Sequence, residues 1–433
     1  MVHNLKLPAD YLAPDAKHPQ DDSGVSPSPS PSASPEDAEG RPSPPERRGS
    51  SFMKFVAGIL GSKNPISQPA DPKVNSVWLL DNTAYQAVPE PEAPEQPSDQ
   101  PAPWQAEFVA CILEKEGRKD AGKFVASIAD YIGLDGESGA ADQETRKRIE
   151  DRVQPFLDRV SPGMNVTVEL DIDGSTQSYP IGPADRNGII SQIVQLDAPH
   201  IQDGAIVQPR ISQFKDNMAC MKTHFAAPSG WLVVSDIDDT IKRTMTMEPT
   251  GILRTTFTEE PVPIPGMPEF YHHVHAELNP TWFYLSASPY NLYPFLHNFL
   301  HHHYPTGTLI LRDYSWMDID GLIKSFTERT QEYKTERMEK IRHWFPQRRV
   351  LCVGDSTQKD PEAYAEMYRK YPSWIHAIAI RKVTNVGHME DKNKDERFEE
   401  AFKDIPSEIW TVYEDPVELY DFVDQLGMED QVL

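Results

Sequence analysis

Two carboxylates and a hydroxyl follow a short apolar run near the middle of the chain, in the stretch WLVVSDIDDT at residues 231–240. Asp236 and Asp238 are two residues apart, and Thr240 follows at the same spacing. The preceding run is mostly β-branched, which predicts a strand buried on both faces in the middle of a parallel sheet. Open α/β sheets bind ligands at the carboxyl ends of such strands. The alternative is a strand followed by a helix whose first turn is capped by Asp or Thr.

Phosphoryl transfer through an aspartyl-phosphate is one chemistry that such a pair of carboxylates can perform. The reaction needs a carboxylate nucleophile and a nearby divalent cation that spreads the charge of the phosphate. It also needs a second carboxyl group that protonates the leaving alkoxide. An i, i+2 pair on a tight loop can direct both groups at one phosphorus.

A βαβ pattern around this pair predicts the elements that position it. We expect strands at 232–236, 281–286, 308–313, 349–354 and 375–381, with helices or irregular segments between them. Five strands with helical crossovers predict an α/β fold with a doubly wound, Rossmannoid parallel sheet over residues 230–383. The charged stretch 384–433, with a helix at 417–426, is interpreted as an appended tail.

The preceding part of the chain is expected to add a helical region at 104–161 and a small antiparallel β domain at 162–229. The helical prediction depends on three apolar stripes, which are Phe108, Val109, Ile112 and Leu113, then Phe124 to Ile132, then Arg148 to Leu157. The β prediction depends on clean alternation from Val166 to Ile172 and an Asp-Gly hairpin signal. Residues 77–103 are interpreted as an apolar tether followed by a Pro/Glu linker.

Residues 1–76 are predicted to be a disordered tail, because a segment so rich in Pro and Ser cannot bury enough apolar surface to order itself. Pro42, Pro45 and Arg47 have the form of a PxxP ligand for an SH3 domain. At 51–61 lies a basic amphipathic segment that either binds a membrane surface or packs on the folded domains. Its apolar residues are Phe52, Phe55, Val56, Ile59 and Leu60, and its basic neighbours are Arg47, Arg48, Lys54 and Lys63.

The composition excludes several classes of protein. A net charge of −25 over 433 residues argues against a nucleic-acid partner. Only three cysteines and no apolar run of about 20 residues predict a protein of a reducing compartment without a membrane span. The absence of a secretory signal pattern adds to the expectation of a cytoplasmic protein. The histidine groups 272–275 and 301–303 lack Cys or acid partners at ligand spacing, which favours surface histidines over a zinc site.

The Asp-x-Asp-x-Thr pattern resembles motif I of the haloacid dehalogenase phosphatase superfamily. This resemblance implies that Asp236 is the nucleophile and a Mg²⁺ ligand. It implies that Asp238 is the general acid and base, with its backbone carbonyl as a further metal ligand, and that Thr240 belongs to the catalytic motif.

The other motifs of the superfamily also have counterparts. A hydroxyl at the end of the second strand should contact a phosphoryl oxygen, and Ser286 is the candidate, with Ser288 as the alternative. The phosphate-binding cation is assigned to Lys334, or else to Lys324. The stretch GDSTQKD at 354–360 resembles the last motif. Asp355 and Asp360 would be metal ligands, although Asp360 could instead cap the following helix, or combine the cap with a role as an acid that supports the metal ligands.

The stretches DIDDTI, GILRTTF, PIPGMPEFY, YLSASPYNLYPFL, LRDYSW and GDSTQKDPEAYAE are similar to the fungal actin-patch phosphatidate phosphatase family over residues 231–382. The resemblance implies Mg²⁺-dependent hydrolysis of phosphatidate to diacylglycerol. It also implies SH3-domain partners of the endocytic machinery and peripheral contact with membranes at cortical actin patches. Arg243 and Arg312 are the candidates for contact with the lipid headgroup, and a structural ion pair is the alternative that each of them alone favours. The alternatives are a phosphomonoesterase for a soluble metabolite and an SH3-binding endocytic scaffold with incidental activity.

Overall fold

The computed structural model describes residues 67–87, 102–115, 121–133, 140–214, 221–313, 319–384 and 386–430. The chain divides into two units, Met1–Lys63 and Asn64–Leu433, and every element below belongs to the second. Residues 1–66 of the predicted disordered tail, which include the PxxP motif and the amphipathic segment 51–61, lie outside the described residues. The rest of that tail, residues 67–76, contains β1 (Gln68–Pro69) and the start of β2 (Asn75–Leu79), so this part of the prediction was wrong. Within the described residues, no helix is both long and apolar enough to cross a membrane.

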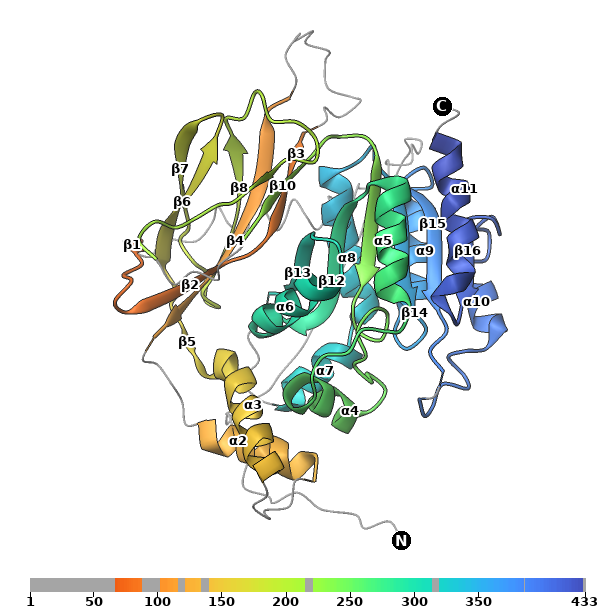
Figure 1. Ribbon diagram of the computed structural model, residues 1–433, viewed down its shortest axis with the longest axis horizontal. Coiled ribbons are helices and arrows are strands. Elements are labelled where there is room, and N and C mark those ends of the chain that lie inside the picture. The colour runs from red at the N-terminus through yellow and green to blue at the C-terminus, as the bar shows by residue number, and fades with distance from the viewer. Residues whose placement is uncertain are drawn as a thin grey trace, which may run out of the picture. The chain divides into compact units, whose positions relative to one another are not determined.

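A six-stranded parallel sheet forms the centre of the second half of the chain, in the order β13-β12-β11-β14-β15-β16 (Figure 1). Its strands are β11 (Trp231–Asp236), β12 (Thr281–Pro289), β13 (Thr308–Arg312), β14 (Arg349–Asp355), β15 (Ile375–Arg381) and β16 (Trp410–Tyr413). All neighbouring strands pair in parallel. The five predicted strands and the α/β class are therefore confirmed, and a sixth strand was missed.

Helices cover both faces of this sheet (Figure 1). Successive residues of a strand point to opposite sides of the sheet, so each strand presents side chains to the helices on both faces. In β11, Val233 packs into one core cluster, while Leu232 and Val234 pack into the other. The first cluster includes residues of α5 (Met267–Leu278), α6 (Tyr293–His303), α7 (Ile319–Thr327) and α11 (Tyr420–Asp430). The second includes residues of α8 (Thr330–Trp344), α9 (Asp360–Lys370) and α10 (Asp395–Ala401).

Strands also dominate the first half of the described chain, and they begin earlier than predicted. One sheet has the order β1-β6-β7, and a larger one has the order β2-β4-β3-β10-β9, with β5 and β8 both paired to β4. These strands are β1 (Gln68–Pro69), β2 (Asn75–Leu79), β3 (Asn82–Gln86), β4 (Trp104–Glu114), β5 (Arg159–Val160), β6 (Met164–Ile172), β7 (Ser175–Ile181), β8 (Ile189–Leu196), β9 (Ile206–Val207) and β10 (Thr223–Ala226). Most pairs are antiparallel as predicted, but β1–β6 and β3–β10 are parallel.

Two boundaries in this region were predicted wrongly. The apolar tether at residues 77–85 is the strand pair β2 and β3, and the first stripe of the predicted helical region is strand β4. Phe108 and Ile112 of β4 are both fully buried, along with most of their neighbours. A strand covered on both faces has a continuous apolar sequence, which periodicity cannot distinguish from a buried helix. The other two stripes are helices, α2 (Ala121–Tyr131) and α3 (Ala140–Leu157).

Helix α3 packs on the segment that follows β11. This segment contains α4 (Pro249–Leu253) and the π-helical turn Arg254–Thr258. Arg148 of α3 donates a hydrogen bond of 2.6 Å to the carbonyl of Thr258. Arg152 donates hydrogen bonds of 3.1 and 2.5 Å to the carbonyls of Thr256 and Glu259. An upstream helix thus supports the loop that leaves the central strand.

The C-terminal stretch is part of the fold rather than an appended tail, so this prediction was wrong. Strand β16 extends the parallel sheet at β15, and α11 packs against α5. Leu419 and Val423 are fully buried members of the same core as the sheet. The short β16 lies between charged segments and is only partly buried, which explains why its pattern was not recognised.

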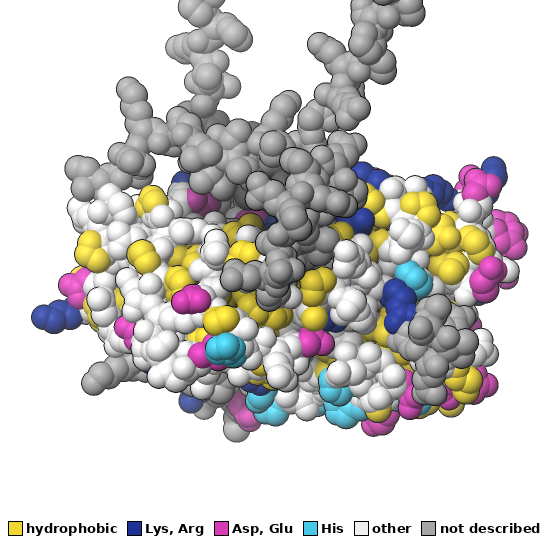
Figure 2. Space-filling model, turned by 90° about the horizontal axis from the view of Figure 1, so that it is seen from above, with side chains coloured by type: hydrophobic (Ala, Val, Ile, Leu, Met, Phe, Trp, Pro, Cys, Tyr) yellow, Lys and Arg dark blue, Asp and Glu magenta, His cyan; other side chains and the backbone are white. Residues whose placement is uncertain are grey.

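The acidic residues on the face shown in Figure 2 are dispersed. Acidic side chains are scattered there among apolar and uncharged ones, and the residues drawn in colour form no continuous basic surface. This distribution accords with the net charge of −25.

We predict that Leu419→Ala lowers the free energy of unfolding by about 2–5 kcal/mol, because it removes a core side chain and leaves a cavity. Val417, two residues earlier in the same short helix and 67% exposed, provides the matched control. Val417→Ala should change stability by no more than about 0.5 kcal/mol. Chemical denaturation of both variants measures the difference, and equal small effects would mean that the segment does not belong to the core.

Candidate active site

Three carboxylates meet where strands β11 and β14 end. The two strands are neighbours in parallel register, with Ser235 opposite Val353, so Asp236 and Asp355 leave the sheet side by side. Asp360 joins them from the first turn of α9. Ligand oxygens of these three residues lie within 4.8 Å of one another, and all three side chains are buried.

A buried lysine provides the positive charge at this cluster. The Nζ atom of Lys334, on α8, lies 2.7 Å from Oδ1 of Asp236 and also donates to Asp360. Lys334 is fully buried. Lys324, the alternative candidate, is an exposed residue of α7. The structure therefore brings Lys334, and not Lys324, to the carboxylates.

Asp360 takes part in the cluster and does not cap its helix. Its Oδ2 accepts a hydrogen bond of 3.0 Å from the backbone N–H of Asp355. The N-cap residue of α9 is Lys359, and no side-chain hydrogen bond caps the helix, so the capping alternative was wrong. Gly354 allows this approach, since a Cβ atom there would lie 2.6 Å from Oδ2 of Asp360.

Thr240 links the two strand ends. Its hydroxyl lies 2.9 Å from Oδ2 of Asp236 and 3.1 Å from Oδ2 of Asp355. The helix-cap alternative for this motif is not what the structure shows, because the chain turns tightly after β11 and the next helix, α4, begins only at Pro249. Thr240 therefore holds the carboxylates of Asp236 and Asp355 next to each other.

Asp238 faces different partners from those of Asp236. Ser286, on β12, donates a hydrogen bond of 2.5 Å to Oδ2 of Asp238, and Thr244 donates one of 2.8 Å to Oδ1. The hydroxyl of Ser288 is buried and has no hydrogen-bond partner among the described residues, while its N–H donates to the Ser286 hydroxyl at 3.0 Å. Both serines thus lie beside the motif.

The third aspartate of the motif, Asp239, shapes the loop, a role that sequence reasoning missed. It adopts a φ of 62° in the left-handed region, and its carboxylate accepts four hydrogen bonds. The donors are the backbone N–H groups of Thr244, Met245 and Thr246 and the hydroxyl of Thr246. An Asp-Asp pair before a Thr-rich turn was the available signal, because Asp often satisfies N–H groups in turns.

A second buried lysine near the motif was also missed. The Nζ atom of Lys242 lies 2.9 Å from the hydroxyl of Thr244, which in turn donates to Asp238. Burial lowers the pKa of Lys242, and the carboxylates of Asp238 and Asp239 oppose this effect. Lys242 follows Asp238 by four residues and belongs to no recognised motif, so only the fold shows that it is buried.

Burial and mutual repulsion dominate the electrostatics of the carboxylate cluster. Burial raises the pKa of Asp236 well above its ordinary value, while Lys334 acts in the opposite direction. Burial and the neighbouring Asp360 raise the pKa of Asp355 to about 7. Burial alone would lower the pKa of Lys334, but the attraction of the surrounding carboxylates outweighs it and raises that pKa. The cluster therefore holds more negative groups than one ammonium can neutralise.

These residues fit a Mg²⁺ ion. Mg²⁺ prefers carboxylate oxygens, and the three carboxylates converge on one another with a single buried ammonium between two of them. Asp236, Asp355 and Asp360 are the side chains that would hold the ion. The side chain of Asp238 faces Ser286 and Thr244 instead, and the role of its backbone carbonyl as a ligand stays a prediction.

The two predicted headgroup arginines have other positions. Arg243 is exposed beside the loop, and its guanidinium contacts the sulfur of Met245 at 3.4 Å. Arg312 stacks 4.9 Å above the ring of Tyr333 and donates to the carbonyl of Glu328 at 2.9 Å. Their contact with a headgroup stays a prediction.

One of the histidines has two acid neighbours, one four residues later on the same helix and one from a distant part of the chain. His273 lies 2.7 Å from Asp424 of α11, and both residues are near Glu277. The expectation that these histidines lack acid partners is therefore wrong at His273. The contact joins α5 to α11.

Comparison with known proteins supports the resemblance found in the sequence. Residues 231–382 match the family described as "Phosphatidate phosphatase APP1, catalytic domain". Phosphatidate phosphatase APP1 of Saccharomyces cerevisiae is 28% identical over 245 residues, which cover 55% of this chain and 41% of the yeast protein. An uncharacterized protein of Schizosaccharomyces pombe is 29% identical over 160 residues, which cover 36% of this chain and 26% of that protein. The chain thus matches less than half the length of either relative, and the predicted resemblance is confirmed.

We predict that the metal-free protein loses stability as the pH rises from about 5 to 8. An ordinary aspartate has a pKa of about 3.9, whereas that of Asp355 is raised to about 7. Between these values the folded protein keeps a proton that the unfolded chain has lost, and this contribution to stability disappears as the pH rises through 7. Thermal unfolding with a chelator present should therefore show that the unfolding midpoint falls by several degrees between about pH 5 and pH 8.

Asp355→Asn should make this dependence on pH shallower, because the amide does not titrate. Mg²⁺ should raise the unfolding midpoint of the unsubstituted protein more at pH 8 than at pH 5.5, since the ion binds the ionised carboxylates. An identical pH slope in the Asn variant would show that Asp355 is not the responsible group.

Proposed function

We propose that this chain is a Mg²⁺-dependent phosphatidate phosphatase that hydrolyses phosphatidate to diacylglycerol and phosphate. One observation carries the proposal. Asp236 and Asp238 leave the same strand two residues apart, yet one faces a lysine and two further carboxylates while the other faces two hydroxyls. Two carboxylates with such different surroundings suit two different roles, nucleophile and acid/base.

In the first step the carboxylate of Asp236 attacks phosphorus and the bond from phosphorus to the glycerol oxygen breaks. Asp238, in its protonated form, gives its proton to that oxygen, so diacylglycerol leaves as a neutral alcohol. In the second step a water molecule attacks the phosphorus of the aspartyl-phosphate, the bond from phosphorus to the Asp236 oxygen breaks, and Asp238 takes a proton from the water. Phosphate is released and both aspartates return to their starting states.

The other residues of the site would neutralise phosphoryl charge and hold the two aspartates in position. Lys334 would neutralise phosphoryl charge next to the nucleophile, since its ammonium already lies 2.7 Å from Asp236. Thr240 holds Asp236 in place. A bound Mg²⁺ would supply electrostatic stabilisation of the phosphoryl oxygens. Ser286 holds Asp238, so a phosphoryl contact by the same hydroxyl would compete with that hydrogen bond, whereas the Ser288 hydroxyl carries no such contact among the described residues.

A lipid substrate is supported by the family match and by the small size of the segment that could cover the site. Between β11 and β12 the structure has only α4, the π-helical turn and α5, and α5 packs on the sheet. This leaves no separate folded domain above the carboxylates from that connection. A site without a large cover suits a substrate whose acyl chains stay in a membrane.

The test is phosphate release from phosphatidate in mixed micelles, compared with glycerol 3-phosphate and with p-nitrophenyl phosphate, each with and without Mg²⁺. We expect Mg²⁺-dependent turnover with phosphatidate strongly preferred over glycerol 3-phosphate. A preference for the water-soluble ester would support a phosphatase for a soluble metabolite and contradict the proposal.

We predict that Asp236→Asn abolishes turnover, because a neutral amide neither attacks phosphorus nor binds a metal as a carboxylate does. Asp238→Asn should lower the rate with phosphatidate by about a hundred- to ten-thousand-fold. Its loss should be smaller with p-nitrophenyl phosphate, whose leaving group needs little protonation. Asp171→Asn on the distant strand β6 is the control and should leave both rates unchanged. Equal losses by Asp238→Asn for the two substrates would contradict its acid role.

We also propose that residues 51–61 bring the acidic enzyme to its membrane and that Pro42, Pro45 and Arg47 bind an SH3 domain of an endocytic partner. These roles rest on the sequence, where an amphipathic segment with flanking Lys and Arg follows the PxxP motif. Basic residues near an anionic membrane contribute about 1 kcal/mol each. Localisation at cortical actin patches is part of the same proposal.

We predict that Phe55→Asp combined with Ile59→Asp weakens binding to anionic vesicles and slows turnover of phosphatidate in them. Hydrolysis of p-nitrophenyl phosphate should be unchanged, because a water-soluble ester requires no binding to a membrane. A parallel loss of both activities would show that the segment packs on the fold instead of binding the membrane.

A further inference from the structure

Arg397, on α10, holds the loop that connects two of the predicted metal ligands. Its guanidinium donates to the carbonyls of Ser356 and Gln358, each at 2.6 Å, and to the carbonyl of Lys392 at 2.9 Å. It also forms a two-point ion pair with Glu362, at 3.2 and 3.0 Å. The Nε, Nη1 and Nη2 atoms of Arg397 therefore all donate hydrogen bonds to the loop or to residues beside it.

The loop needs these donors because it is buried without regular structure. Residues 356–359 form a turn between β14 and α9, and Ser356, Thr357 and Gln358 are all buried. Buried carbonyl groups that lack a donor are costly. Lys392 donates to the carbonyl of Thr357, so the stretch 392–397 supplies a donor to each of three successive loop carbonyls.

The shape of this loop determines where Asp355 and Asp360 point. The N–H of Thr357 donates to Oδ1 of Asp355 at 2.5 Å, inside the loop. The N–H of Asp355 donates to Oδ2 of Asp360 at 3.0 Å, across it. A change in the backbone at 356–358 would therefore move both carboxylates relative to Asp236, which stands on another strand.

We propose that Arg397 is a positioning residue that sets the affinity of the carboxylate site for Mg²⁺, by bracing the loop 356–358. The inference rests on the proposed function only in taking the three carboxylates as a metal site. Arg397 itself lies beyond the matched family segment 231–382. Residues that orient metal ligands without touching the metal typically change its affinity by about ten- to a hundredfold. Arg397→Met should weaken Mg²⁺ binding by that factor, since it keeps the aliphatic stem and removes every donor.

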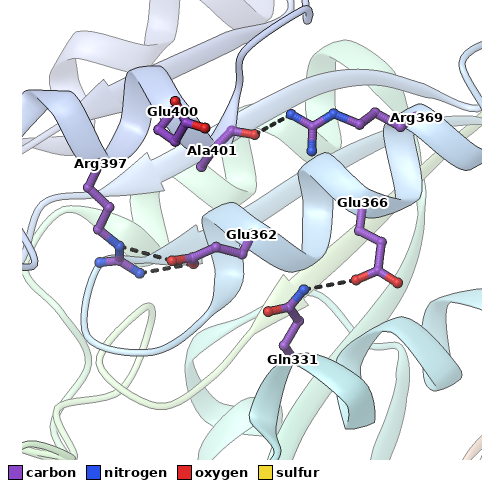
Figure 3. A pocket seen from close by; sticks show the side chains of 7 residues that line it. All are labelled: Gln331, Glu362, Glu366, Arg369, Arg397, Glu400 and Ala401. Atoms are coloured by element: carbon purple, nitrogen blue, oxygen red, sulfur yellow. Dashed lines mark hydrogen bonds and ion pairs between the residues drawn. The ribbon is translucent and has the colours of Figure 1, made fainter.

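The structure offers a matched control in the same surface pocket. Figure 3 shows Arg397 and Arg369 at opposite ends of the pocket, with Arg397 directed at Glu362 and Arg369 at Ala401. Arg369 donates to the carbonyls of Ala401 and Lys403, at 2.7 and 2.8 Å. Among the described residues it thus anchors the end of α10 and makes no hydrogen bond to the loop 356–358. If Arg397 acted only by attaching α10, Arg369→Met would have the same effect.

The experiment is calorimetric titration with Mg²⁺ alone, without substrate, on the full chain and on both variants. We expect the Mg²⁺ dissociation constant to rise about ten- to a hundredfold in Arg397→Met and less than about threefold in Arg369→Met. In the assay with p-nitrophenyl phosphate, Arg397→Met should need correspondingly more Mg²⁺ for half-maximal activity and approach the unsubstituted rate at saturating Mg²⁺. If Arg397→Met does not fold, Arg397→Lys, which keeps the charge but cannot reach several acceptors at once, takes its place.

Three outcomes would overturn the proposal. They are an unchanged Mg²⁺ affinity in the folded Arg397 variant, an equal loss in the Arg369 control, and no Mg²⁺ binding by the unsubstituted chain. Failure of the proposed function appears separately, as Mg²⁺ binding without phosphatidate hydrolysis. In that case the role of Arg397 at the metal site stands.

Discussion

The site depends on the burial of several carboxylates against one ammonium group. Asp236, Asp355 and Asp360 lie together out of contact with solvent, and Lys334 pairs with two of them. Removing ionised groups from water is costly unless each is paired. One lysine cannot neutralise three carboxylates, so at least one must keep its proton or share a cation. The raised pKa values of Asp236 and Asp355 express this constraint. On the proposed function, a divalent cation bound by these carboxylates would offset their mutual repulsion.

The loop after β11 separates two aspartates that are close in sequence. Asp239 turns the backbone into the left-handed region and ties down three N–H groups of the following segment. That segment carries Thr244, whose hydroxyl reaches Asp238 from one side while Ser286 reaches it from the other. Asp238 is thereby kept out of the cluster that contains Asp236. On the proposed function this separation matters, since an acid/base group inside the cluster would compete for the cation that the other carboxylates would hold.

Sequence reasoning identified the residues whose position follows from strand ends, and it failed where position depends on tertiary packing. The buried runs before Asp236 and Asp355 predicted β11 and β14, and parallel strands bring their carboxyl ends to one edge of the sheet. Family resemblance added Lys334, but only the packing of α8 distinguishes it from Lys324. Strand β4 was mistaken for a helix because burial on both faces removes alternation. Lys242 and Arg397 belong to no motif, and their roles follow from burial and from the carbonyls that they reach.

The C-terminal segment illustrates why a family match does not mark the limit of a functional unit. The match ends at residue 382, next to the end of β15. The sheet nevertheless continues to β16, and the N–H of Val383 already donates to the hydroxyl of Ser356 in the loop between the two aspartates. Backbone polar groups in a buried loop require partners wherever the chain supplies them. Here these partners include Val383, Lys392 and Arg397, so the loop that connects Asp355 and Asp360 is held in part by groups outside the matched segment. A fragment that ended at 382 would keep every motif residue and lose the donors that give the loop its shape.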